Sequence, residues 1–127
     1  MCAIENAGLD PDNDPCLSGQ VITPLEITEL LAEFQRAGLD AEIRYSSFYE
    51  IGCYLRVQDE KSALIFEKIE PEEYLVHGDA DSLKELIALA RSVSQMLCQS
   101  ELRHRFELYD SQDQLVDYVH FNWSQHN

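Results

Sequence analysis

Residues 49 to 57 limit the possible folds more than any other part of the chain. Their side chains alternate between apolar and more polar at every second position, which is the period of a β-strand with one wet face. The apolar set is Tyr49, Ile51, Cys53, Leu55 and Val57. Similar short patterns cover residues 41–48, 62–69 and 73–78, and no helical pattern separates them. Because strands that follow one another without intervening helices pair side by side, the middle of the chain predicts an antiparallel sheet.

Two segments have the apolar spacing of amphipathic helices. The first covers residues 24–37, where Thr23 and Glu26 have the spacing of a capping box. The second ends near residue 99, and either Asp79 or Asp81 is expected to cap its start. Both helices therefore begin at residues whose side chains can accept hydrogen bonds from free backbone amides.

A final hairpin, residues 103–123, follows the second helix. The predicted order is αββββαββ, an α+β fold with an antiparallel sheet of about five or six strands and two helices packed on one face. With 127 residues and 45% apolar composition, the chain can bury one core, so residues 21–127 predict a single domain. Residues 1–20 are rich in glycine, proline and acidic side chains, and they predict a poorly ordered N-terminal segment.

The hairpin has two possible registers, and these place His104 and His120 differently. A loop over residues 110–114 sets the two histidines opposite each other with their Cβ atoms about 5 Å apart, close enough for the side chains to share a metal or a proton. A two-residue loop at 112–113 shifts the pairing by one residue, so that His104 faces Phe121 and the two histidines lie on opposite faces. The second register gathers more apolar side chains, each worth about 1.5–3 kcal/mol when buried, and we favour it.

The charge of the chain favours a basic protein as its partner. Lys and Arg number 9 against 24 Asp and Glu, which gives a formal charge of −15 spread along the whole sequence. Such a chain repels the phosphates of nucleic acids and of anionic membranes, whereas it speeds the approach of a basic protein. The residues expected to bind that partner are three carboxylates at an exposed corner and three aromatic residues: Glu70, Glu72, Glu73, Tyr54, Tyr118 and Trp123.

The sequence contains no motif of an enzyme or a cofactor site. It has no GxSxG, no phosphate-binding glycine loop, no HExxH and no EF-hand spacing. His104 and His120 would supply only two of the three or four ligands of a zinc site, so we expect neither metal nor cofactor. The four cysteines have no CxxC pair, and we interpret them as free thiols. Without a secretory signal or about 18 consecutive apolar residues, the chain is expected to be cytoplasmic and not to span a membrane.

These observations predict a small acidic protein-binding module. Bacterial immunity proteins and the small acidic chaperones of secreted effectors bind in this way. The size and charge of this chain, and its element order once the short fourth strand is set aside, broadly resemble the chaperones. One alternative is a metal- or ligand-binding enzyme that uses His104 and His120 on one face of the hairpin. A second alternative is a structural subunit of a homodimer formed at an uncovered sheet edge.

Overall fold

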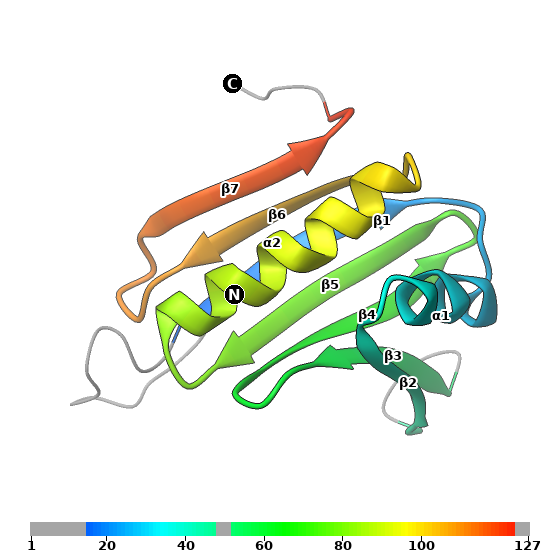
Figure 1. The fold of residues 1–127 in the computed structure, drawn as a ribbon, viewed down its shortest axis with the longest axis horizontal. Helices are drawn as coiled ribbons and strands as arrows, with labels where there is room; N and C mark the ends of the chain where they lie inside the picture. Colours follow the sequence, from blue (N-terminus) through cyan, green and yellow to red (C-terminus); the bar gives the residue numbers. More distant parts are fainter. Residues whose placement is uncertain (1–14, 48–51, 124–127) are drawn as a thin grey trace.

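The computed structural model describes residues 15–47 and 52–123, which form seven strands and two helices (Figure 1). In chain order these are β1 (Cys16–Ile22), α1 (Ile27–Arg36), β2 (Asp40–Tyr45), β3 (Cys53–Gln58), β4 (Ser62–Glu70), β5 (Glu73–Ala80), α2 (Leu83–Gln99), β6 (Arg103–Tyr109) and β7 (Leu115–Phe121). The start of the predicted strand 49–57 lies outside the described residues, and the rest of it is β3.

All seven strands belong to one sheet, in the order β2-β3-β4-β5-β1-β6-β7, and every neighbouring pair is antiparallel. Both helices lie on the same face of this sheet, as Figure 1 shows. The predicted α+β class, antiparallel sheet and two helices are therefore confirmed. The strand number and the order αββββαββ are corrected, because an additional strand precedes α1.

The strand that the sequence did not reveal is β1, the fifth strand in the sheet, which joins β5 to β6. Residues 16–20 were expected to be part of the poorly ordered segment, and they instead pair on both sides. Gly19 interrupts the apolar alternation of Leu17 and Val21, which hid the strand. A Cβ at Gly19 would lie 2.3 Å from the carbonyl oxygen of Arg105, so the close approach of the two backbones requires glycine here.

The core lies between the sheet and the two helices. Alternate strand residues face the helices and are buried, and α1 contributes Leu30 and Phe34 to the same layer. The ring of Phe34 packs against Phe66 of β4 with centroids 5.2 Å apart. The core residues of α2 are Leu86, Leu89, Ala90, Val93, Met96 and Leu97. Neither α1 nor α2 lies over the opposite face of the sheet, and we call this the uncovered face.

Both helices begin later than predicted. The capping box of α1 uses Glu26, whose backbone amide donates to Glu29 Oε1 at 2.8 Å. Thr23 is instead buried at the end of β1, where its amide donates to the carbonyl of Glu72. The cap of α2 is Ser82, which accepts from the amide of Glu85, because the strand β5 continues through Asp79. No helix in the described ranges is long and apolar enough to cross a bilayer.

Candidate binding surfaces

The β6–β7 hairpin separates the two histidines. His104 pairs with Phe121, and His120 pairs with Arg105, so the favoured register is confirmed along the strands. Near the turn the register shifts, because Leu108 pairs with Asp117 whereas the next residue, Tyr109, pairs with Leu115. A bulge thus gives the hairpin the loop over residues 110–114 that the first register predicted. Along the strands, the pairing is that of the second register.

His104 lies on the helix side of the sheet and is completely buried. Its Nδ1 lies 2.8 Å from the carbonyl oxygen of Leu102, an acceptor, so Nδ1 carries the proton and donates. The hydroxyl of Ser94 then donates to Nε2 at 2.7 Å. Burial lowers the pKa of His104, which favours this neutral form. The pair connects α2 to β6 inside the core.

The histidine-based enzyme alternative requires both imidazoles on one face, and the register does not provide this geometry. His120 projects from the uncovered face, where its ring stacks on Tyr118 at 5.0 Å. Within residues 15–47 and 52–123, no group of three or more His, Cys, Asp or Glu side chains could hold a metal ion. Ser94 has no signal in the sequence, because only the fold brings it to His104.

The favoured register also places the carboxylate of Asp117 on the helix side of the sheet. The structure shows how this carboxylate is accommodated. Arg91 of α2 binds it through two nitrogens, with Nη2 2.9 Å from both carboxylate oxygens and Nε 3.1 Å from Oδ2. This bidentate pair links the middle of α2 to the edge strand β7.

The uncovered sheet face carries a hydrogen-bonded network across three strands. Arg105 of β6 donates to Gln20 of β1 and to Glu107, and Gln20 donates to Glu73 of β5 at 2.7 Å. The ring of Trp123 lies against the guanidinium groups of Arg103 and Arg105, at 4.7 and 5.3 Å. Such cation–π contacts hold the indole on this face.

The structure brings only some of the predicted partner-binding residues together. Glu73, Tyr118 and Trp123 share the uncovered face, near the network of Arg105. Tyr54 projects from the same face on β3, but five strand spacings separate β3 from β7, or about 24 Å. Glu70 and Glu72 are exposed at the β4–β5 turn. These six residues therefore do not form one compact site.

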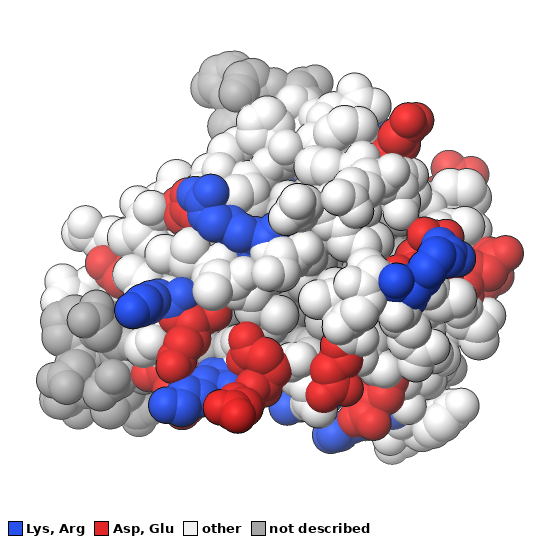
Figure 2. All heavy atoms as spheres, viewed as in Figure 1, with Lys and Arg blue, Asp and Glu red and all other residues white. Residues whose placement is uncertain are grey.

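Carboxylates gather at the other end of the sheet. The β3–β4 turn, the β5–α2 connection and the β6–β7 turn all lie at this end, because Ala63, Asp79, Cys16 and Tyr109 occupy successive paired positions. We call this region the acidic end, and its residues are Asp40, Asp59, Glu60, Asp79, Asp81, Asp110 and Asp113. On the face shown in Figure 2, acidic side chains gather at the lower left, where Figure 1 places the β3–β4 turn and the start of α2.

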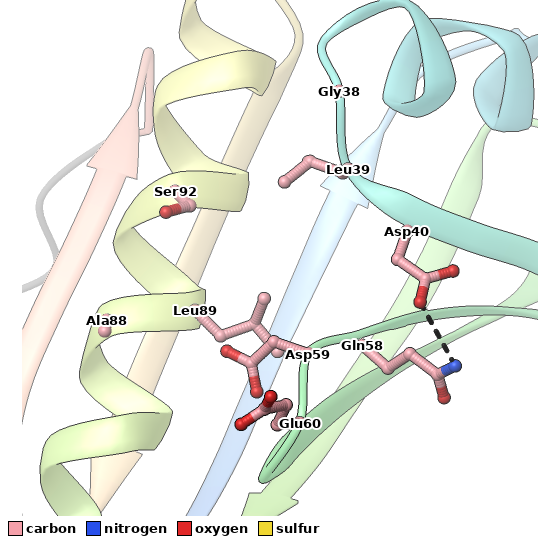
Figure 3. Close-up of a pocket in the computed structure, with 9 residues that line it drawn as sticks. All are labelled: Gly38, Leu39, Asp40, Gln58, Asp59, Glu60, Ala88, Leu89 and Ser92. Atoms are coloured by element: carbon pink, nitrogen blue, oxygen red, sulfur yellow. Dashed lines mark hydrogen bonds between the residues drawn. The ribbon is translucent and has the colours of Figure 1, made fainter.

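A cleft of about 640 Å³ opens at the acidic end, between α2 and the turns that flank β2 and β3 (Figure 3). Its lining is Gly38, Leu39, Asp40, Gln58, Asp59, Glu60, Ala88, Leu89 and Ser92. No Lys or Arg of the described chain forms an ion pair with Asp40, Asp59 or Glu60. The cleft thus combines apolar side chains from Leu39 and Leu89 with these carboxylates, of which Asp40 accepts a hydrogen bond from Gln58 and Asp59 accepts three from Lys61 and Ser62 through Oδ1.

The cysteines do not all match the expectation of free thiols. Cys16 is disulfide-bonded, so the expectation is wrong for this residue. Cys53 and Cys98 are free. Sequence spacing could not reveal the difference, because the irregular cysteine spacing resembles no known disulfide framework.

Together, the fold and these surfaces define a small α+β domain. Its antiparallel sheet carries both helices on one face, and an acidic cleft opens at one end of the sheet. No protein-family model, curated protein or solved structure matches this chain.

Proposed function

We propose that the protein binds a basic protein partner, and that the cleft at the acidic end is the contact surface. The observation that carries this proposal is one cleft that combines an apolar lining with three carboxylates, none of which is ion-paired to a Lys or Arg in the described part of the chain. A partner segment with lysine or arginine on either side of an aliphatic residue would match both the carboxylates and the apolar lining of the cleft. Its cations would face Asp40, Asp59 and Glu60, and its apolar side chain would lie against Leu39.

The net charge of −15 supports the same partner over a longer range. A negative field attracts a basic protein from beyond contact distance and raises the association rate, particularly at low salt. The same charge disfavours nucleic acids and anionic membranes. The immunity-protein and effector-chaperone hypotheses both remain compatible with this mode of binding. The cytoplasmic location remains a prediction, and the disulfide of Cys16 is more typical of an oxidising compartment.

The test is binding of a synthetic lysine- and leucine-containing peptide to the full-length protein, measured by titration calorimetry. The double variant Asp40→Asn, Glu60→Gln removes two charges from the cleft and leaves the turn bonds of Asp59 intact. We expect its Kd to rise about tenfold, corresponding to about 1.4 kcal/mol. The affinity of the native protein should also fall as salt increases.

The matched control is Glu70→Gln, Glu72→Gln, which removes the same number of charges from the β4–β5 turn. We expect this variant to bind almost as well as the native protein. If the control loses affinity and the cleft variant does not, the contact surface is the β4–β5 corner that the sequence predicted. Binding that is insensitive to both variants and to salt would overturn the electrostatic proposal.

A further inference from the structure

A second hollow borders the β3–β4 turn beside the acidic cleft. Its volume is about 410 Å³, and it shares Asp59 and Glu60 with the cleft. The rest of its lining comes from β3, from the β3–β4 turn and the start of β4, and from the end of β5: Arg56, Lys61, Ser62, Ala63, Asp79, Ala80 and Asp81. A segment bound in the cleft can therefore continue into a second concave surface on the neighbouring strands.

The charges of this second hollow favour the same kind of partner. Its two cations already bind groups of the protein itself. Arg56 donates to Gln58 at 2.7 Å, and Lys61 pairs with Glu85 at 3.8 Å. Asp79, by contrast, is exposed, and its carboxylate makes no hydrogen bond or ion pair with any residue that the structure describes. This carboxylate therefore complements a lysine or arginine of a partner.

Strand pairing fixes the distance between this carboxylate and the cleft. Asp40, which lines the cleft, pairs with Gln58 of β3. Gln58 pairs with Ala63 of β4, which in turn pairs with Asp79 of β5. Because paired residues project to the same face of a sheet, the side chains of Asp40 and Asp79 leave the sheet on the same side. Three strand spacings of about 4.8 Å separate them, which gives about 14 Å.

An extended segment spans this distance with four residues. A strand advances about 3.3 Å per residue, so residues four positions apart lie about 13 Å from each other. Side chains at even separations also project to the same side of an extended segment. In an α-helix, four residues advance only about 6 Å, which is too short to reach both carboxylates. The spacing of Asp40 and Asp79 therefore favours an extended partner segment.

We propose that the basic partner segment is extended and carries a further lysine or arginine, four residues from the one that faces Asp40. This further cation binds Asp79 in the second hollow, and the residues between the two cations cross the sheet over Gln58 and Ala63. The inference rests on the proposed function, since it takes the cleft as the first contact of the segment. It adds the conformation of the segment and the spacing of its cations.

Titration calorimetry of the full-length protein with peptides of different lysine spacing tests this inference. The short peptide contains the core Lys-Leu-Lys. Two longer peptides add one lysine four residues beyond either end of this core, which covers both directions of binding. We expect one of them to bind the native protein about fivefold more tightly than the short peptide, as for a good exposed ion pair. Moving its added lysine to the third position should remove the gain, because odd separations project to the opposite side of an extended segment.

The variant Asp79→Asn removes the second contact. It should reduce the gain of the longer peptide to less than about twofold and leave the affinity for the short peptide unchanged. Asp113→Asn is the matched control, because it removes one charge from the acidic end at the β6–β7 turn, outside both hollows. Asparagine suits the φ of 62° at this position as well as aspartate does, and we expect the gain to persist in this variant.

The outcomes separate this inference from the proposed function. If the native protein binds none of the peptides, both fail. If the short peptide binds and neither longer peptide gains affinity, the cleft remains the contact surface and the second contact is overturned. The second contact is also overturned if the gain persists in Asp79→Asn, is lost equally in Asp113→Asn, or is the same for lysines at the third and fourth positions. Each of these results would indicate charge attraction without a defined site.

Discussion

Single residues in this protein take their chemical character from the side of the strand on which they lie. His104 and His120 belong to the same hairpin, yet one is buried against Ser94 and the other is exposed beside Tyr118. Apolar alternation was sufficient to predict this separation, because the register that buries Phe106 must also bury His104. Ser94, by contrast, could not be predicted, since nothing in the sequence relates it to β6.

The burial of His104 predicts a pH-dependent stability. Its pKa in the folded protein lies below the ordinary value of 6.5, so the unfolded chain binds a proton at a higher pH than the folded one. As pH falls below about 6.5, the free energy of unfolding should therefore decrease, by at most about 1.4 kcal/mol per pH unit for this one group. Urea unfolding of the native protein and of His104→Asn between pH 5 and 7.5 measures the difference, and the variant should have the smaller slope.

His120→Asn is the control for this experiment, since it removes an exposed histidine from the same hairpin. Because His120 is only a minor cause of the lowered pKa of His104, this variant should change the pH slope less than His104→Asn does. Equal slopes in the native protein and His104→Asn would mean that other groups dominate the acid sensitivity.

Helices and strands were predictable where their apolar period is uninterrupted. This holds for α1, α2 and β3, whereas β1 was missed because Gly19 occupies a core-facing position without a side chain. The helix starts were displaced for a related reason. Thr23 and Asp79 have suitable side chains for capping, but the strand pairing of their backbones takes precedence.

The link between α2 and β7 can be measured by a double-mutant cycle on Arg91 and Asp117. The pair is bidentate and Asp117 has only 16% of its side chain exposed, so we expect a coupling near the upper end for surface pairs, about 1 kcal/mol. Thermal unfolding of Arg91→Ala, Asp117→Asn and the double variant gives this value.

The comparison pair is Arg36 with Glu33, which makes a single contact at 2.7 Å on the surface of α1. Its coupling should be about 0.3 kcal/mol. A coupling for Arg91 and Asp117 that is no larger would show that the pair merely shields Asp117 without stabilising the hairpin.

In the whole molecule, the distribution of charge matters more than its total. The sequence shows acidity throughout, and only the fold gathers carboxylates from distant turns at one end of the sheet. The cleft could not be predicted, because its lining comes from residues 38–40, 58–60 and 88–92, which are distant in the sequence. The corner at Glu70 and Glu72 could be predicted from the sequence because these two residues are only two positions apart.

The net charge predicts that salt stabilises the protein. Self-repulsion among carboxylates acts over about 30 Å at 0.01 M salt but only about 8 Å at 0.15 M. We expect the Tm to rise by about 2–5 °C over this range, since about 1 kcal/mol corresponds to several degrees in a domain of this size. Scanning calorimetry in sodium chloride measures the rise.

Choline chloride provides the control, because it screens charge without offering a small cation that could bind carboxylates. Equal effects of the two salts would confirm screening. A rise in Tm with sodium alone would indicate cation binding at the acidic end instead, and an unchanged Tm would contradict the prediction.

The position of β1 also has a consequence for how the chain acquires its structure. This strand is synthesised before both of its neighbours in the sheet, which are completed only at Ala80 and Tyr109. Until then the hairpins on either side cannot join into one sheet. Because such pairing between distant parts of the chain slows folding, we expect the two edges of β1 to pair late, first with β5 and only afterwards with β6.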